Sequence, residues 1–340
     1  MGSDAFAVNS ALEIVRHGGA EQLACILLRM PDKQSANLIA TSSMVQRTSY
    51  IDRVMDPELS LTVCQRADTS AMRMLERFLE LPGTADKSLY FEDGCPANRF
   101  TLQPHQKAQA SLSTGAGGFG LPSAESRRTL ASLGSLMATV SEVLTDLSGP
   151  LGEKVRRELP NSDLVRRICS SVRDLRDIHG VSEEAMANVV PGSWRNRAFR
   201  ANEKGVSGQS DVEVLPAHDG ETISSHKAQH KLGKQVNRVR YQLYIVSLDQ
   251  LPEEARPSGS NDVFGGIKTR HLAKARQRSL SGPGAVACLR ARPVDPARII
   301  PASEFVSIGR RFLGMEEPLA ARCPCCEATD VNTRHARTCH

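Results

Sequence analysis

The strongest constraint on the fold of this chain is a run of apolar residues between positions 130 and 147. They recur at spacings of three and four, which places them on one face of an α-helix. The run consists of Leu130, Leu133, Leu136, Met137, Val140, Val143, Leu144 and Leu147. Ser123 is a candidate N-cap ahead of it, and Gly149 and Pro150 follow as a stop signal. The pattern predicts a long amphipathic helix that must pack against other elements.

Shorter segments show related patterns. Residues 8–30 are expected to form two short helices around Gly18 and Gly19, and residues 36–82 to continue as helices. Further helices are expected near 151–160, 162–176, 182–189 and 303–313, and a helix or a strand at 231–249. Residues 84–122 are polar and loop-rich, and residues 201–230 are expected to form a mobile linker.

The last eighteen residues contain four of the nine cysteines and two of the nine histidines. Their spacing is Cys323-x2-Cys326-x8-His335-x3-Cys339, or the pattern ends instead at His340. Two short-range pairs of ligands separated by a small loop are typical of a tetrahedral zinc site. Cys325 is an alternative ligand. The other interpretation is a reduced, exposed cluster that binds metal only adventitiously. Because a ligand would be the final residue, we expect the chain to be part of a longer protein.

Composition agrees with a helical core. Hydrophobic residues make up 40% of the 340 residues, whereas aromatic residues make up only 4%. A core of Leu, Val, Ile, Ala and Met suits packed helices better than a sandwich of sheets. The predicted fold class is mainly α: an irregular helical bundle with long polar linkers and a small C-terminal zinc-knuckle-like module.

Two basic segments are candidates for contact with nucleic acid. The first is Lys227–Arg240, which Tyr241 and Tyr244 follow. Cations near aromatic rings can contact phosphates and stack on unpaired bases, although an ordinary solvated face has the same composition. The second segment precedes the cysteine cluster, as basic residues often do beside a small zinc module. Its cations are Lys268, Arg270, Lys274, Arg276 and Arg278. The net charge of +5 is compatible with a nucleic-acid partner without establishing one.

Enzyme motifs are missing from the sequence. The glycine cluster at Gly115–Gly120 lacks the Gly-Lys-Ser/Thr ending of a phosphate-binding loop. His226 and His230 stand four residues apart, but Lys227 occupies the place where a metalloprotease has glutamate. The chain has no Gly-x-Ser-x-Gly elbow and no adjacent aspartates of the polymerase type. We therefore expect a protein that is not an enzyme.

The remaining sequence features concern location. No apolar run approaches the roughly 18 residues needed to span a bilayer, so no membrane partner is expected. Five cysteines outside the terminal cluster are widely scattered, at positions 25, 64, 95, 169 and 288. Without a signal peptide, this spacing indicates reduced thiols in an intracellular protein, either nuclear or cytoplasmic. The oligomeric state stays open.

Several further stretches form a series along the chain. They are Leu23–Arg29 with Ala36–Ile39, Gln106–Leu112 followed by Gly117–Leu121, Ser123–Ala124 and Leu133–Ser135, then Ser281–Ala285 with Pro296 and Phe305, and Cys323–Cys339. Taken in this order, they resemble the region C-terminal to the catalytic domain of non-LTR retrotransposon reverse transcriptases, over roughly residues 10–340. The series from Gln106 to Ser135 is the closest match, because that family has a Gly-Gly-x-Gly-Leu turn that opens a helix of small residues.

The resemblance implies a helical thumb and connector, and a zinc knuckle that grips template RNA or target DNA. On this basis residues 1–83 are thumb-like and residues 84–200 form a helical connector. Residues 201–265 form the mobile linker with one helix or strand, and residues 266–340 hold the basic segment and the CCHC or CCHH knuckle. The family's catalytic aspartates and its downstream nuclease have no counterpart here, and Glu327 stands where glycine is common.

The expected function is that of a non-catalytic, reverse-transcriptase-like retrotransposon fragment that binds RNA and/or DNA at its C-terminus. Zinc would be a structural cofactor held by Cys323, Cys326, His335 and Cys339, with His340 and Cys325 as substitutes. The cations from Lys268 to Arg278 would contact phosphates. Two alternatives are a helical scaffold or interaction protein with an incidental cysteine cluster, and a degenerate gene fragment without function.

Overall fold

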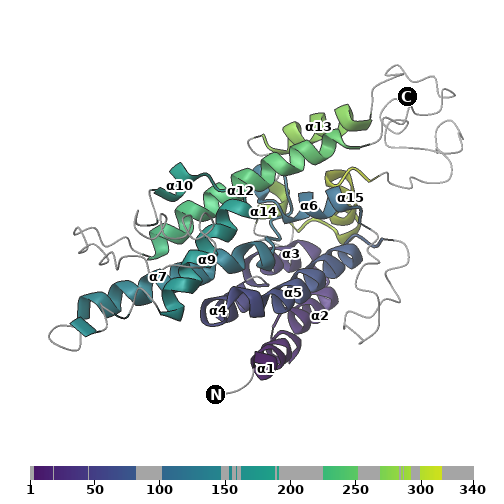
Figure 1. The fold of residues 1–340 in the computed structure, drawn as a ribbon. Helices are drawn as coiled ribbons and strands as arrows, with labels where there is room; N and C mark the ends of the chain where they lie inside the picture. Colours follow the sequence, from purple (N-terminus) through teal and green to yellow (C-terminus); the bar gives the residue numbers. More distant parts are fainter. Residues whose placement is uncertain are drawn as a thin grey trace, which may run out of the picture. The chain divides into compact units, whose positions relative to one another are not determined.

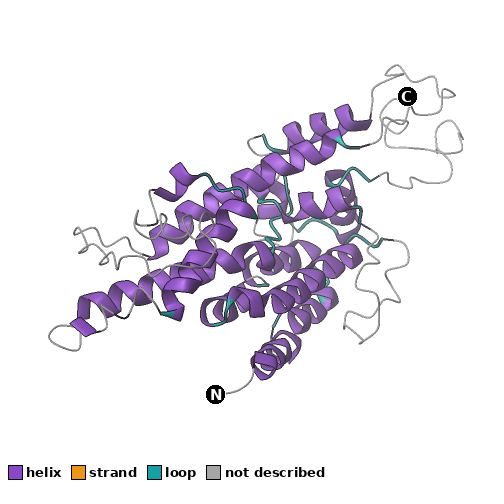
Figure 2. Cartoon of the chain, in the orientation of Figure 1, coloured by secondary structure: helices purple, strands orange, loops and turns teal. Residues whose placement is uncertain are grey.

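The chain is described from a computed structural model that places helices, and no strand, in its described residues (Figure 2). These residues are 4–17, 19–44, 46–81, 102–146, 153–154, 158, 162–187, 190, 225–251, 269–282, 285, 287–291 and 299–315. The predicted mainly α character is confirmed for this part of the chain. The predicted zinc-knuckle module lies outside it.

The helices belong to two compact units, each assembled from three separate stretches of chain. Unit 1 draws on Met1–Gly19, Val45–Asp68 and Pro122–Gln242, and unit 2 on Ala20–Met44, Thr69–Leu121 and Leu243–His340. Helices α5 (Pro57–Phe78) and α12 (Ser225–Asp249) contribute residues to both (Figure 1). The domain boundaries expected from the sequence, which follow the chain in order, stay predictions.

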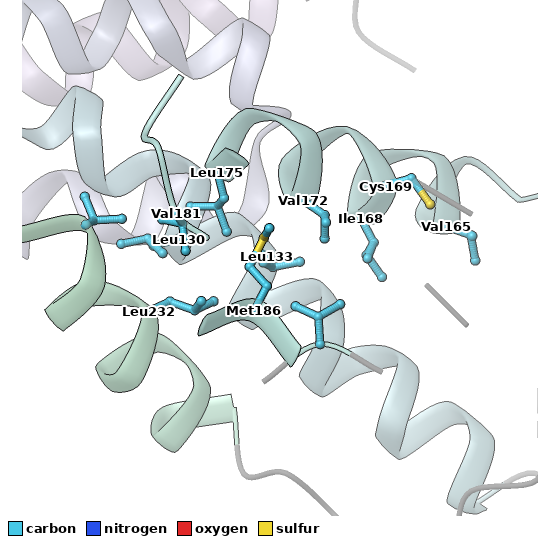
Figure 3. Packing of buried hydrophobic residues seen from close by; sticks show 12 residues of the cluster. Leu130, Leu133, Val165, Ile168, Cys169, Val172, Leu175, Val181, Met186 and Leu232 are labelled. Atoms are coloured by element: carbon cyan, nitrogen blue, oxygen red, sulfur yellow. The ribbon is translucent and has the colours of Figure 1, made fainter. Parts of the chain in front are cut away.

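The core of unit 1 forms where α7 meets α9, α10 and the first part of α12. These helices are α7 (Ala124–Asp146), α9 (Asp163–Asp177) and α10 (Glu183–Ala187), and α1 (Asp4–His17) and α4 (Gln46–Val54) complete the unit. Leu130 and Leu133, from the run that predicted α7, are buried against Ile168, Val172 and Leu175 of α9 (Figure 3). The predicted apolar stripe of α7 therefore faces the core in this part of the helix.

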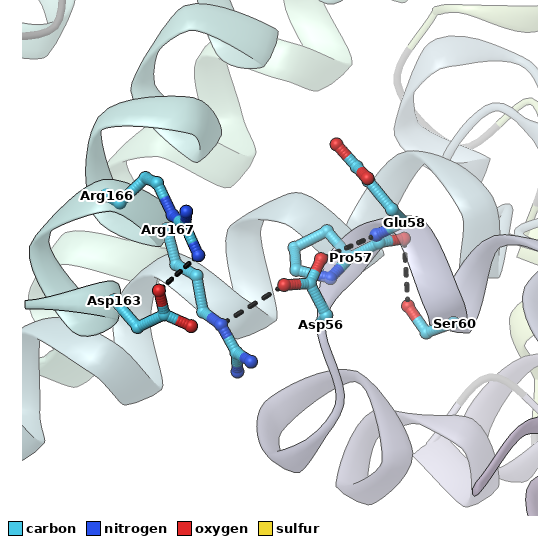
Figure 4. Close-up of polar contacts among 7 residues, drawn as sticks. All are labelled: Asp56, Pro57, Glu58, Ser60, Asp163, Arg166 and Arg167. Atoms are coloured by element: carbon cyan, nitrogen blue, oxygen red, sulfur yellow. Dashed lines mark hydrogen bonds and ion pairs between the residues drawn. The ribbon is translucent and has the colours of Figure 1, made fainter. Parts of the chain in front are cut away.

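Helix α5 begins at a proline and is tied to α9 at that end. Asp56 precedes Pro57, and its Oδ1 accepts a hydrogen bond of 3.0 Å from the backbone N–H of Glu58 (Figure 4). The other carboxylate oxygen of Asp56 lies 3.1 Å from Nε of Arg167 on α9. Proline suits the first turn of a helix because its missing N–H would be unpaired there anyway. One carboxylate thus caps α5 and links it to α9.

Helix α7 begins where two side chains accept its unpaired backbone N–H groups. Ser123 Oγ accepts from the N–H of Ser126 at 3.2 Å, which confirms the predicted N-cap. Asp68 of α5 accepts from the N–H groups of Ala124 at 2.6 Å and Glu125 at 3.2 Å. It also accepts from Ser123 Oγ at 2.6 Å. A carboxylate at a helix N-terminus is further favoured by the helix dipole.

Replacing Ser123 with alanine is expected to lower the free energy of unfolding by about 1–2 kcal/mol. The change removes the acceptor for Ser126 N–H and the donor to Asp68. Urea unfolding followed by circular dichroism measures the loss. Ser42→Ala is the control, because the exposed Ser42 hydroxyl bonds only within α3. Its partners are the carbonyl oxygens of Leu38 and Ile39 and the hydroxyl of Ser43. Equal stability of the two variants would show that Asp68 caps α7 without Ser123.

Unit 2 is built around the phenylalanines that are sparse in the sequence. Phe78, Phe119 and Phe305 are fully buried, and the rings of Phe119 and Phe312 meet edge to face at 6.0 Å. The unit's elements are α2 (Ala20–Arg29), α3 (Lys33–Ser43), α6 (Pro104–Ser111), the 3-10 helix η1 (Thr114–Ala116), α13 (Thr269–Leu280), α14 (Ala287–Arg290), α15 (Ala302–Phe312) and the ends of α5 and α12. Aromatic area is thus concentrated in one core.

Glycines shape the turn between α6 and α7. Gly117 has a φ of +77°, a left-handed conformation that glycine adopts without the strain of a side chain. A Cβ on Gly118 would lie 2.6 Å from the carbonyl oxygen of Gln109, closer than real atoms approach. The turn therefore needs glycine, and it delivers Phe119 into the unit 2 core.

Several helices match their predicted positions, and two expectations were wrong. Helices α1 and α2 flank Gly19, α3 to α5 cover the predicted 36–82 range, and α15 occupies the predicted 303–313 range. Residues 104–111 were expected to be loop but form α6. The sequence did not reveal this helix because it buries mainly polar residues rather than an apolar face. Residues 225–230, expected to be linker, belong to α12, which also decides the helix-or-strand alternative for 231–249 in favour of a helix.

No helix in the described part of the chain combines the length and the hydropathy needed to cross a membrane.

Candidate nucleic-acid interface

The predicted zinc ligands lie outside the described residues. These are Cys323, Cys326, His335, Cys339 and His340, with Cys325 as the alternative. Within the described residues, no three His, Cys, Asp or Glu side chains gather where they could hold a metal ion. Four of the scattered cysteines are described, namely Cys25, Cys64, Cys169 and Cys288, and none of these four is in a disulfide. The zinc site stays a prediction.

Helix α13 carries four of the five cations predicted to contact phosphates, while Lys268 lies outside the described residues. Lys274 Nζ forms an ion pair with Asp249 at the end of α12. The Arg276 guanidinium is half-buried beside Tyr244, and burial lowers its pKa. Arg270 is half-buried, and Arg278 is exposed to solvent. Two of these cations therefore hold α13 against α12 within unit 2.

The buried face of α13 explains how the helix is oriented. Ala273 and Gln277 are buried, and the Gln277 amide donates to the carbonyl oxygen of Ala116 in η1. A Cβ placed on Gly117 would lie 3.0 Å from Cβ of Leu280, so α13 also packs directly on the glycine turn. The basic helix is thus anchored by one face. Arg278 lies away from it, on the exposed side.

Helix α12 divides the cations of the first basic segment between solvent and core. Lys231, Lys234 and Arg238 are exposed. Arg240 points inward and donates to Ser126 Oγ at 3.0 Å, and burial lowers its pKa while Asp68 and Glu125 oppose that effect. Tyr244 is buried in unit 2 and donates to Gln109 Oε1 at 3.1 Å. The segment therefore combines structural and surface residues.

Sequence reasoning missed a buried polar cluster in unit 1. The Cys64 thiol donates to Asp52 Oδ1 at 2.9 Å, and both residues are buried. Burial raises the pKa of Asp52 to about 6 and that of Asp68 to about 6. Cys64 and Asp68 stand four residues apart on α5, a spacing that places them on one helix face. In the sequence, this spacing was the one feature that could have indicated the cluster.

The side chains of this cluster bond between helices of unit 1. Burial and the neighbouring Asp52 raise the pKa of the Cys64 thiol far above its ordinary value, so the nucleophilic thiolate is suppressed. The Asp68 carboxylate accepts hydrogen bonds from the backbone N–H groups at the start of α7. Arg128 donates to the carbonyl oxygen of Pro57, which holds the start of α5 against α7. These groups connect three helices inside unit 1.

Comparison with known proteins finds no matching family model, no matching curated protein and no matching solved structure.

Proposed function

We propose that this chain is a non-catalytic fragment of a retrotransposon-type reverse transcriptase protein that binds RNA and/or DNA through a C-terminal zinc knuckle. One observation supports this proposal above the others. Most of the described stretches on which the resemblance rests belong to unit 2, whereas Ser123–Ala124 and Leu133–Ser135 belong to unit 1. Those in unit 2 include α6, the glycine turn, the segment after α13 and α15.

Their contacts join residues that are distant in sequence. Gln106 of α6 donates to the carbonyl oxygen of Leu313 at 3.1 Å, and Gln109 donates to that of Phe312 at 2.8 Å. Phe119, from the glycine turn, packs its ring against Phe312. Because these motifs pack against one another, the position of each one depends on the others. This gives a physical reason for their fixed order along the chain.

The same body would support the knuckle. Helix α15 ends at Phe312, shortly before Cys323, and its Arg310 donates from Nε to the Leu79 carbonyl at 2.8 Å. Arg310 Nη2 also donates to the Glu80 carbonyl at 2.7 Å. The chain therefore leaves a helix that is fixed in unit 2. A small zinc module following such an anchor, with α13 in the same unit, is suited to holding nucleic acid beside a basic surface.

The zinc content of the purified full-length chain tests the proposal. We expect one zinc ion per chain, lost in the Cys323→Ser/Cys326→Ser variant, because tetrahedral sites need all four ligands. The matched control is Cys25→Ser/Cys288→Ser, which removes two half-buried thiols outside the cluster and should keep the zinc. Metal analysis after exhaustive dialysis gives the ratio. A parent protein without zinc would contradict the knuckle.

A helical interaction protein is the second candidate, and exposed apolar side chains favour it. Tyr50 and Val54 stand one turn apart on α4 and are 70% and 58% exposed. Exposed apolar residues that recur on one helix face are typical of protein-binding surfaces. The two candidates differ in affinity for nucleic acid. The interaction protein predicts binding no tighter than nonspecific, without dependence on zinc.

A further inference from the structure

Three cations form a line along the solvent side of α12, and Lys231, Lys234 and Arg238 are named here the α12 stripe. Their spacing of three and four places them on one helix face, and all three are exposed. The other face buries Leu232 and Val236 in the core of unit 1. A Cβ placed on Gly233 would meet no atom within 4 Å, so the space beside the stripe is open.

The charge of the α12 stripe is not neutralised within the described part of the chain. None of its three side chains makes a hydrogen bond or ion pair there. Helix α12 contains no acidic residue before Asp249, its last, and that carboxylate pairs with Lys274. By contrast, Arg166 and Arg167 of α9 each pair with an aspartate. The stripe therefore projects a positive field toward solvent.

An aromatic ring continues the same face. Tyr241 follows Arg238 by three residues and is half-buried, whereas Tyr244 is turned into the core. At 1.5 Å per residue the stripe extends over about 10 Å, enough to reach more than one phosphate of a strand. Cations followed by a partly exposed ring favour single strands, because unpaired bases can stack where duplex bases cannot.

We propose that the α12 stripe and Tyr241 bind single-stranded nucleic acid, with the cations on phosphates and the ring against a base. This inference rests on the proposed function, because it names a second surface, in unit 1, that the same partner would occupy. In α13, Lys274 pairs with Asp249 and Arg276 lies beside Tyr244, so these two cations are not available to phosphates. The α12 stripe would supply the phosphate contacts instead.

Fluorescence anisotropy with labelled 20-nucleotide oligouridine and oligothymidine tests the stripe in the full-length chain. The variant is Lys231→Gln/Lys234→Gln/Arg238→Gln. We expect affinity at about 0.1 M salt to fall about tenfold to a hundredfold and the salt slope to fall by about 2, since single strands give about 0.7 per phosphate contact. The control, Arg53→Gln/Lys154→Gln/Arg166→Gln, removes the same charge from other exposed positions in unit 1 and should lose much less.

The outcomes separate this inference from the proposed function. If the parent chain binds and the stripe variant keeps its affinity and salt slope, the inference is wrong and the proposed function stands. If the parent binds neither the oligonucleotides nor a duplex of the same length, both fail; if it binds only the duplex, the inference alone fails. Equal losses in the stripe and control variants would also overturn the inference, because only net charge would matter. A stripe variant that loses binding to anionic vesicles, but not to oligonucleotides, would replace the partner with a lipid surface.

Tyr241 has a separate readout. Tyr241→Phe should bind both oligonucleotides as the parent does, because stacking needs only the ring, whereas Tyr241→Leu should bind about tenfold more weakly. A duplex of the same length serves as the comparison, and its binding should not change between the two variants. Equal loss on duplex and single strand would exclude base stacking and contradict the preference for single strands.

Discussion

Replacing Phe119 with alanine is expected to lower the free energy of unfolding by about 3–5 kcal/mol, the largest effect of any substitution proposed for this chain. The ring is 0% exposed and meets Phe312 at a centroid distance of 6.0 Å. Gly309 of α15 lets it approach, because a Cβ there would lie 3.2 Å from the edge of the ring. Truncation would leave a cavity bordered by α15 and the glycine turn.

Urea unfolding monitored by circular dichroism measures the loss. Tyr50→Ala is the matched control, because it removes an aromatic ring that is 70% exposed on α4, and it should change stability by less than about 1 kcal/mol. Phe119→Leu, which refills much of the volume, should fall between the two. If Phe119→Ala and Tyr50→Ala unfold alike, the packing of the glycine turn against α15 is incorrect.

The success of the helix predictions depended on how each helix buries its surface. Leu130 and Leu133 face the core of unit 1, so the spacing that places them on one face was visible in the sequence. Helix α6 was missed because its buried residues include Gln106 and Gln109, which bond to carbonyl groups of α15 and the residue after it. No local pattern in residues 104–111 reveals acceptors that lie more than 200 positions later.

The candidate interface shows the same limit for charged residues. Both basic segments were recognised from residue type, but the sequence alone favoured α13 over α12. Lys274 and Arg276 turn out to hold Asp249 and Tyr244, whereas Lys231 and Lys234 face solvent. Whether a cation is structural or available depends on tertiary neighbours, which periodicity does not report. The zinc ligands can be predicted from the sequence in a way that the cations cannot. Their spacing is local, so the prediction does not depend on residues that are distant in the sequence.

Buried carboxylates give the chain a pH dependence that the sequence did not indicate. Burial raises the pKa of Asp52 from 3.8 to about 6, with Asp68 adding to the effect and the Cys64 hydrogen bond opposing it. The folded state therefore holds the Asp52 proton more tightly than the unfolded chain does. The contribution of Asp52 to stability is fully present below about pH 4 and is lost as pH rises through about 6.

Replacing Asp52 with asparagine is accordingly expected to raise the free energy of unfolding by about 1–3 kcal/mol at pH 8, since each pKa unit corresponds to about 1.4 kcal/mol. The amide oxygen can still accept the Cys64 thiol, so the variant removes the buried charge and keeps that bond. At pH 4 the gain should vanish, because the parent carboxyl is then largely protonated in the folded state. Urea unfolding at both pH values measures the difference.

Two further variants decide whether charge burial is the cause. Asp4→Asn, at an exposed position in the first turn of α1, should change stability by less than about 0.5 kcal/mol at either pH. Asp68→Asn should destabilise at pH 8, although the Asp68 pKa is raised to about the same value, because the lost carboxylate caps α7. Opposite signs for Asp52→Asn and Asp68→Asn would separate a carboxylate for which the cost of burial dominates from one whose two oxygens are both needed as acceptors at the start of α7. A loss of stability in Asp52→Asn at pH 8 would instead show that the Cys64–Asp52 pair depends on the ionised form.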